Sequence, residues 1–447
     1  MRDCDFPQTV RTALAVCILL FGSLRVGASE VSDCVSGGMA RVPSEQWEQA
    51  ARLVRVNADW ARWLSRVRQA TDRWLAQDRE SADYVAGVIH DYVDTVTQVP
   101  LSWTPESPIP ETKGLARDAW VAYMRLNNVQ RIRDAARLYK LTGDDVYLRW
   151  AARQLDFYSN YYSRWPLRTK WGYSRMMVQP LDEAMAAMHL VDSVRLLKGA
   201  VSTDRQLQWK NALLVPLAEN LKRSDLGVSN VSLWIASALT AIGYEIGEPS
   251  YVKDGLWGPR GVYSLLRSGL GEDGLWLEGS FGYNTYVLRA LVPMFITATI
   301  HGHCIDVAAA ARSVRRMLIT PYQLVFEDGT LPNPSDSTLR FKPDDPYIHL
   351  EFYRVLASED GISAARRIRS WDTLIDPVSN TENTPPDGDK VVASRLFPAA
   401  KMAVLKKDGW QVFFRYGQAT YKHAQIEALN TETVSYTHLT LPTIYSV

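Results

Sequence analysis

The sequence predicts a mainly α-helical fold, an incomplete α/α toroid of helical hairpins followed by the start of an antiparallel β-sandwich domain. From Pro43 to about Gly361, apolar residues recur at three- and four-residue spacing in successive helix-length segments. Helical hairpins that follow one another without strands must stack into a solenoid or close into a toroid. The 15 tryptophans and 21 tyrosines favour the toroid, because sugar rings stack on aromatic faces in a cleft, although most of these aromatics belong to the core.

The first 28 residues have the pattern of a secretory signal peptide. Arg11 precedes an apolar run at residues 12–24, and small residues ending at Ala28 supply a cleavage site. The alternative is a membrane anchor, which the pattern disfavours because the run is too short to span a bilayer. We therefore expect a periplasmic or secreted protein with no membrane span.

The net charge and the cysteine count argue against a nucleic-acid-binding protein, a disulfide-stabilised fold and a zinc protein. A formal net charge of +1 gives no field that would attract nucleic acid, so an acidic ligand must meet a local cluster of cations. Of four cysteines, only Cys34 and Cys304 lie beyond the signal, and two thiols so far apart in the chain predict neither a disulfide framework nor a zinc site. No cofactor or metal is expected.

The helical region, residues 29–385, shows its repeating unit best near Gly143. Gly143 is expected to end one helix in the left-handed conformation. Asp144 or Asp145 is expected to cap the next helix, which runs to Tyr162. Two antiparallel helices on so tight a loop form an αα-hairpin.

The chain changes character after a polar, proline-containing stretch at residues 381–390. Residues 401–417 alternate with period two and predict a β-hairpin turned at Lys407 to Gly409. Residues 386–433 are expected to begin a sandwich domain that is truncated, because the roughly thirty residues after Tyr416 cannot complete one. Residues 434–447 fit neither the period nor the chemistry of the preceding strand and are expected to be a non-native tail.

Six stretches together resemble the heparinase II/III-like polysaccharide lyases, a family that includes oligo-alginate lyases. They are LTGDDVYLRWA, QPLDEA, SNVSLWIASALTAIGYEIGE, DGLWLEGSFGYNTYVLRAL, EDGTLPNPSDST and FRYGQATYKHAQIEALN. They occur in the family's order and cover most of residues 115–430. The resemblance implies a toroid followed by a β-sandwich, and β-elimination on uronic-acid polymers such as heparan sulfate or alginate. The chain departs from the family at Val231, where His or Trp often follows the asparagine, and in lacking the distal sandwich, where relatives can carry a structural ion.

β-Elimination sets three chemical roles. The proton at C5 of a uronate is only weakly acidic beside a charged carboxylate. The site therefore needs a group that neutralises the carboxylate, a base for C5 and an acid for the leaving glycosidic oxygen. The resemblance assigns these roles to Asn230, Tyr283 and His423. Asn230 neutralises the carboxylate and Tyr283 donates to the leaving oxygen; whether Tyr283 or His423 is the base stays open, and His423 can instead orient the carboxylate.

Each of these residues also has a structural interpretation. Asn230 stands where a loop enters a helix, so it is either an N-cap or Asx turn, or a donor to a substrate carboxylate. Tyr283 and Tyr286 lie about one turn apart on a helix expected to begin near Gly282. Tyr286 either continues an apolar stripe into the core, the favoured interpretation, or contacts substrate, whereas Tyr283 is better placed to face a cleft.

His423 is predicted on or beside a strand, where a lone histidine is usually structural. Gln425 and Glu427 alternate with it and are expected on its face. They either contact substrate or point to water from an edge strand.

A loop rich in cations and aromatics is a further candidate for substrate contact. Arg168 and Arg175 are interleaved with Trp171, and such groups suit an acidic sugar, although a solvated loop would look similar. Gln179, with Asp182 and Glu183 after it, is expected to line the cleft, with a helix cap at Asp182 as the alternative.

Two other functions fit the same sequence. Glu278 and Asp336, which are substrate contacts in the lyase interpretation, lie near glycine-rich loops and can instead be the paired carboxylates of a glycoside hydrolase. A non-catalytic periplasmic glycan-binding protein would keep the cleft without the chemistry.

Overall fold

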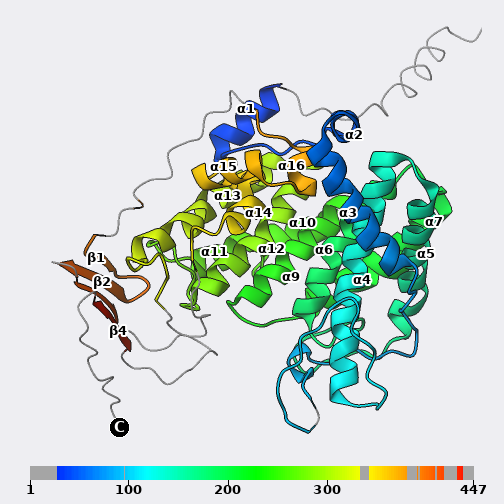
Figure 1. The fold of residues 1–447 in the computed structure, drawn as a ribbon, viewed down its shortest axis with the longest axis horizontal. Helices are drawn as coiled ribbons and strands as arrows, with labels where there is room; N and C mark the ends of the chain where they lie inside the picture. The colour runs from blue at the N-terminus through cyan, green and yellow to red at the C-terminus, as the bar shows by residue number, and fades with distance from the viewer. Residues whose placement is uncertain are drawn as a thin grey trace, which may run out of the picture.

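The computed structural model describes residues 28–94, 96–332, 342–379, 390, 393–407 and 410–416, and the backbone alone of 430–435. Figure 1 shows a helical body with a small β-sheet at one side. The predicted fold class is confirmed, because a mainly helical region precedes an antiparallel sheet in the chain.

The α-helices of the described residues vary in length from one turn to several. They are α1 (Ala28–Gly37), α2 (Trp47–Val56), α3 (Ala58–Leu75), α4 (Leu115–Thr142), α5 (Asp145–Tyr161), α6 (Pro180–Leu197), α7 (Thr203–Trp209), α8 (Val215–Arg223), α9 (Asn230–Ile246), α10 (Pro249–Trp257), α11 (Val262–Gly269), α12 (Phe281–Ile300), α13 (Cys304–Ile319), α14 (Pro346–Leu356), α15 (Glu359–Arg367) and α16 (Trp371–Ile375). Short 3₁₀ segments occur at η2 (Ile89–Asp91), η3 (Tyr162–Arg164) and η5 (Thr320–Leu324), and a π-helical segment at η4 (Lys210–Leu214).

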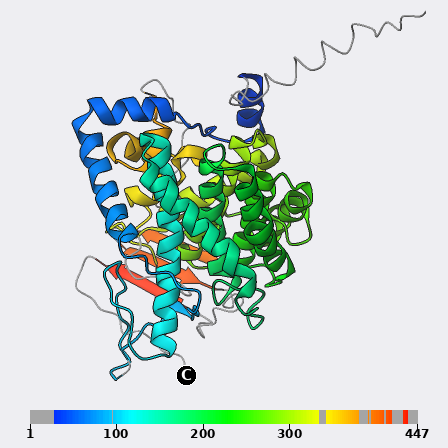
Figure 2. The ribbon, with the colours of Figure 1, turned by 90° about the vertical axis from the view of Figure 1, so that its right-hand side faces the viewer.

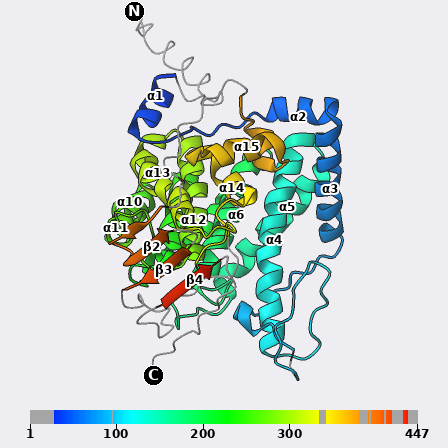
Figure 3. The same ribbon diagram turned by 60° about the vertical axis from the view of Figure 1, so that its left-hand side comes forward.

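The long helices form two layers. In the inner layer α4, α6, α9, α12 and α14 pack side by side in that order. In the outer layer α5 covers α4 and α6, α8 and α10 cover α9, and α13 covers α12 and α14. Helix α2 packs against both α4 and α16. Figures 2 and 3 show α2 and α3, in dark blue, along the outside of the helical body. Nearly every residue of α9 is buried, as expected for an apolar helix with neighbours on all sides.

The predicted αα-hairpin at Gly143 is confirmed. Gly143 follows α4 with a φ of 73°, a left-handed conformation that favours glycine. Asp144 is the residue that caps α5, since its Oδ1 accepts a hydrogen bond from the amide of Val146 at 3.0 Å. The helix ends at Tyr161, one residue before the expected position.

The sheet has the strand order β1 (Arg395–Phe397), β2 (Met402–Lys407), β3 (Trp410–Arg415) and β4 (Asn430–Ser435), and all neighbours are antiparallel. The predicted hairpin is confirmed by the pairing of Lys407 with Trp410, although turn residues 408 and 409 lie outside the described residues. Phe397, Val404 and Phe413 pack with Phe281 of α12, so the sheet lies against the start of that helix. The predicted domain boundaries and the non-native tail stay predictions.

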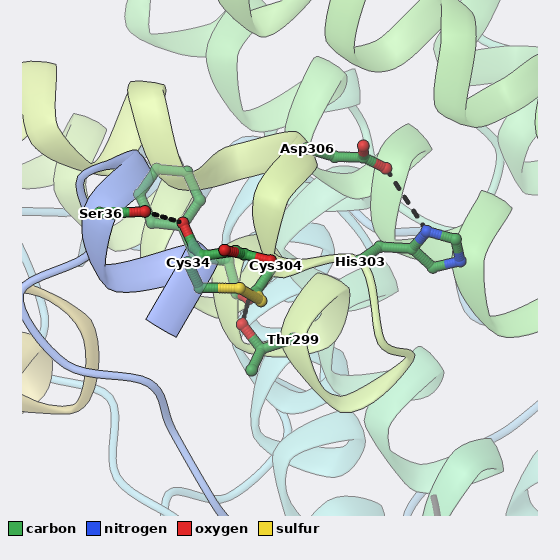
Figure 4. Close-up of a disulfide and its surroundings, with 8 residues drawn as sticks. Cys34, Ser36, Thr299, His303, Cys304 and Asp306 are labelled. Atoms are coloured by element: carbon green, nitrogen blue, oxygen red, sulfur yellow. Dashed lines mark hydrogen bonds and ion pairs between the residues drawn. A yellow bond between two sulfur atoms is a disulfide. The ribbon is translucent and has the colours of Figure 1, made fainter. Parts of the chain in front are cut away.

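Cys34 and Cys304 form a disulfide that the sequence interpretation did not expect (Figure 4). Their Cα atoms are 5.7 Å apart although 270 residues separate them in the chain. The two thiols meet because α1 packs directly on α13, a long-range contact that cysteine spacing does not reveal. The bond ties the first described helix to the outer layer.

No helix in the described part of the chain has both the length and the apolar character that crossing a bilayer requires.

Candidate active site

The candidate site lies where α6, α9 and α12 begin. The ring of Tyr286 on α12 lies 5.4 Å from that of Trp234 on α9, and its hydroxyl donates to Sδ of Met185 on α6 at 2.9 Å. Each of these three residues is in the first two turns of its helix. The three neighbouring helices therefore run parallel, and their N-termini, with their unpaired amides and partial positive charge, lie at one end of the body.

Asn230, the first residue of α9, is fixed by a carboxylate from a different part of the chain. Its Nδ2 lies 3.0 Å from both Oε1 and Oε2 of Glu278, and its backbone amide donates to Oε2 at 2.9 Å. The N-cap interpretation of Asn230 is wrong, because the cap is Ser229, whose side chain accepts from the amide of Ser232. The asparagine is thus held by a tertiary contact and not by its own turn.

The chemistry of the Asn230 amide follows from that contact. A carboxylate only accepts hydrogen bonds, so Nδ2 and not Oδ1 must face Glu278. One N–H directed between the two carboxylate oxygens serves both, so the second N–H diverges from this pair and is not used by Glu278. The Oδ1 atom is buried without a hydrogen-bond partner among the described residues. Such an amide can donate to an anionic group placed beside the start of α9.

Glu278 serves to organise this region. It is 2% exposed and also accepts from Nε1 of Trp276 at 2.6 Å, in addition to the two donors of Asn230. A carboxylate whose oxygens are already engaged by three donors is poorly suited to act as one of two opposed catalytic carboxylates. Asn230 is buried with it, at 3% exposed. Asp336, the other member of that predicted pair, lies outside the described residues.

Tyr283 and Tyr286 both lie near the start of α12 and are both partly buried against the helical core. Ser280 caps α12, so the helix begins at Phe281, one residue before the expected start, and Tyr283 lies in its first turn. Tyr286 packs between α6 and α9, and burial together with the nearby Asp182 carboxylate raises the pKa of its hydroxyl. This setting supports a packing role for Tyr286. Tyr283 lies in the first turn of α12, and its catalytic role stays a prediction.

Asp182, in the first turn of α6, adds a titratable group. It is 3% exposed, and burial raises its pKa to about 6, against the opposing effects of a hydrogen bond from Gln179 and the charge of His90. Nε2 of Gln179 donates to Oδ2 of Asp182 at 3.1 Å, and Gln179 occupies the N-cap position, so the cap interpretation of Asp182 is wrong. Sequence reasoning missed His90, because only the fold brings η2 toward α6.

The loop before α6 is held mainly by its own backbone contacts. The guanidinium of Arg175 donates to the carbonyls of Ser163 and Trp165, while its backbone amide donates to Glu183. Burial raises the pKa of Glu183 to about 7, and Tyr162 also donates to that carboxylate. Arg175 and Glu183 therefore brace the loop, and substrate contact by Arg175 stays a prediction.

Two other residues of this loop keep features that suit a ligand. Nε of Arg168 is buried without a hydrogen-bond partner in the described part of the chain. Trp171 is 40% exposed, with the ammonium of Lys170 4.6 Å from its ring centroid. The role of Arg168 and Trp171 in substrate contact stays a prediction.

The sheet lies beside the loop that leads into α12. A cavity of about 210 Å³ separates the loop before α12 from the sheet, and Trp276, Gly279, Lys401 and Arg415 are among the residues that line it. Lys401 and Arg415 bring cations that the sequence reasoning did not single out. The predicted residues His423, Gln425 and Glu427 lie outside the described residues.

Within the described ranges, no group of three or more histidine, cysteine or acidic side chains is arranged to hold a metal ion.

The chain matches no protein-family model. It is 23% identical over 197 residues to an exo-oligoalginate lyase from Saccharophagus degradans, and the match covers 41% of this chain and 26% of that relative. The sequence resemblance to this group of polysaccharide lyases is thereby confirmed. The chain spans about a quarter of the length of this curated relative.

Two solved structures are also similar. The crystal structure of heparinase III has a TM-score of 0.45 at 14% identity, covering 87% of this chain and 63% of that one. Heparan sulfate lyase HepC from Pedobacter heparinus has a TM-score of 0.47 at 14% identity, covering 86% of this chain and 61% of that one.

Proposed function

We propose that this protein is a polysaccharide lyase that cleaves a uronic-acid-containing polysaccharide, of the heparan sulfate or alginate type, by β-elimination. The product is an unsaturated uronate with a double bond between C4 and C5. The observation that carries the proposal is the Asn230 amide, held by Glu278 so that a second N–H remains at the meeting point of three helix N-termini. The exo-oligoalginate lyase that resembles the chain in sequence supports the same reaction class.

The helix starts suit a uronate carboxylate. Free amides and the partial positive charge at the N-termini of α6, α9 and α12 favour a negative group placed among them. The second N–H of Asn230 can donate to that group. Drawing charge out of the carboxylate makes the proton at C5 more acidic, which is the first requirement of the elimination.

The elimination itself needs a base and an acid. The base removes the proton from C5, the electron pair forms the C4–C5 double bond, and the bond from C4 to the glycosidic oxygen breaks. Tyr283, in the first turn of α12, donates a proton to the leaving oxygen in this proposal. His423 abstracts the C5 proton or orients the carboxylate.

Export from the cytoplasm is part of the same proposal. An acidic polysaccharide is met outside the cytoplasm, and residues 12–24 have the pattern of a secretory signal. The Cys34–Cys304 disulfide supports an oxidising compartment such as the periplasm, because disulfides are rare where thiols are kept reduced.

The test is incubation of the protein with heparan sulfate, alginate and hyaluronan while ultraviolet absorbance is followed. A lyase creates an absorbing C4–C5 double bond with each cleavage. Cleavage to saturated ends without an ultraviolet signal would overturn the proposal and support a hydrolase. Binding without cleavage of any of the three polymers would support a glycan-binding protein instead.

A further inference from the structure

A second charged depression lies away from the candidate active site. It has a volume of about 480 Å³ and lies between α3 and the segment that follows α15. We call it the arginine groove; its lining residues are Asp59, Arg62, Ser65, Arg66, Arg367 and Arg369. Its volume falls in the range of sites that hold small ligands.

The groove is strongly cationic in a protein that is nearly neutral. Four arginines and one carboxylate line it, whereas the whole chain carries a formal net charge of +1. Asp59 pairs with Arg62 along the helix. Within the described part of the chain no carboxylate lies within ion-pair distance of Arg66, Arg367 or Arg369. Three like charges that face one depression without counter-charge favour an anionic ligand.

Arg369 is the most firmly placed of these side chains. Its guanidinium carbon lies 4.8 Å from the ring centroid of Trp60, which is 6% exposed. Its Nη1 reaches the carbonyls of Arg366 and Arg367 at 3.4 and 3.3 Å. Its Nε is buried without a hydrogen-bond partner among the described residues. A stacked guanidinium with a spare donor is set in place before any ligand arrives, so less conformational entropy is lost on binding.

The groove and the candidate site lie on different elements. The groove uses the start of α3 and the end of α15, whereas the candidate site uses the starts of α6, α9 and α12 and one face of the sheet. Figures 1 and 3 show α3 and the sheet on opposite sides of the molecule. A ligand in the groove therefore does not contact Asn230 or Tyr283.

We propose that the arginine groove is a second, non-catalytic binding site for an acidic saccharide, which it holds through carboxylate or sulfate groups. Planar guanidinium groups bind such oxyanions through two parallel hydrogen bonds, and four arginines can engage successive charged sugars. The identity of the ligand as the polymer that the enzyme cleaves rests on the proposed function. A second site on the same molecule raises the local concentration of the chain at the active site, as in bivalent binding.

The test is a binding titration with the intact protein carrying Tyr283→Phe, so that the saccharide is not consumed. The ligands are size-defined heparan sulfate and alginate oligosaccharides, with a neutral cello-oligosaccharide for comparison. Arg66→Gln removes one groove cation, and Arg73→Gln removes an exposed cation from the far end of the same helix, outside the groove. Because Tyr283→Phe leaves active-site binding nearly intact, the titration should show two sites for an acidic oligosaccharide. We expect Arg66→Gln to weaken binding at one of them about tenfold or more, and Arg73→Gln to leave both unchanged.

Equal affinities of the Arg66→Gln and Arg73→Gln variants for the acidic oligosaccharide would overturn the proposed groove site. Binding of the neutral oligosaccharide as tightly as the acidic one would overturn it as well. Titration with inorganic sulfate alone tests whether the groove binds a free anion or an anionic group carried on a saccharide. Sulfate binding that is lost in Arg66→Gln, without any binding of the oligosaccharides, would also overturn a saccharide site.

The binding test of the arginine groove does not depend on whether the protein cleaves the polymer. If the protein with Tyr283 intact cleaves none of the polymers, the proposed function fails while the groove affinities still decide the second site. If cleavage occurs, Arg66→Gln with Tyr283 intact should raise KM for the polymer several-fold and leave kcat for the shortest cleaved oligosaccharide unchanged. An unchanged KM for the polymer would contradict the bivalent role.

Discussion

The side-chain amide of Asn230 donates to both carboxylate oxygens of Glu278, and each Nδ2–Oε distance is 3.0 Å. Asn230 begins α9, and Glu278 lies in the loop that leads into α12. One buried contact therefore sets the position of an amide donor and the relation between two helix starts. In the proposed mechanism Glu278 is therefore a positioning residue, since Asn230 supplies the donor for the substrate carboxylate.

We expect Glu278→Gln to reduce kcat about 100-fold, because a glutamine presents one acceptor where the carboxylate presents two, and Asn230 then loses its fixed orientation. KM should change much less, since other groups hold the rest of the saccharide. Steady-state kinetics on the cleaved polymer measure both constants.

Glu272→Gln is the matched control, since Glu272 is an exposed carboxylate in the same loop. It should retain activity. A loss of activity in Glu278→Gln that tracks a lowered Tm, and that returns when the assay is cooled, would show that Glu278 supports only the fold.

Replacement of Tyr283 by Phe should lower kcat by 100-fold to 10,000-fold, the usual range for a lost proton donor, with binding nearly intact. Tyr286→Phe is the matched comparison one turn further along α12. The Tyr286 hydroxyl donates only to the weak acceptor Met185 Sδ among the described residues, so its removal should change kcat less than about threefold. Kinetics and equilibrium binding on both variants decide the assignment, and full activity in Tyr283→Phe would remove that residue from the mechanism.

The features that the sequence predicted are mostly local. Gly143 and Asp144 follow from the conformational freedom of glycine and the short side chain of aspartate, and both depend only on neighbouring residues. The pairing of Lys407 with Trp410 follows from alternation and a short turn.

The features that the sequence missed depend on contacts between distant segments. Asn230 and Glu278 are 48 residues apart, and nothing in either stretch indicates that the second positions the first. Cys34 and Cys304 meet only because α1 packs on α13. The arginine groove joins α3 to residues about 300 positions later, so nothing in either stretch indicates that their arginines line one depression.

Asp182 should make stability depend on pH. Burial raises its pKa from 3.8 to about 6, so the folded state holds the proton more tightly than the unfolded state. The free energy of unfolding is therefore higher below pH 4 and falls as the pH rises through the interval from about 4 to 6, after which the penalty is complete. A rise of about two units in the pKa of Asp182 corresponds to a loss of about 3 kcal/mol in the free energy of unfolding.

Asp182→Asn should remove this dependence, since the amide keeps an acceptor for Gln179 and does not ionise. The measurement is denaturant unfolding of both proteins at intervals from pH 4 to pH 7, with the difference between them plotted against pH. A flat difference for Asp182→Asn would contradict a buried carboxyl group with a raised pKa.

The Cys34–Cys304 disulfide should stabilise the folded protein, because it lowers the conformational entropy of the unfolded chain. It closes a loop with a sequence separation of 270 residues, and native disulfides typically contribute about 2–4 kcal/mol. The double variant Cys34→Ser, Cys304→Ser should therefore unfold at lower denaturant concentration than the oxidised protein. Reducing agent should lower the midpoint of the oxidised protein to that of the variant and leave the variant unchanged. Identical midpoints before reduction would mean that α1 separates from α13 without unfolding the helical body, so that the bond restrains only the first described helix.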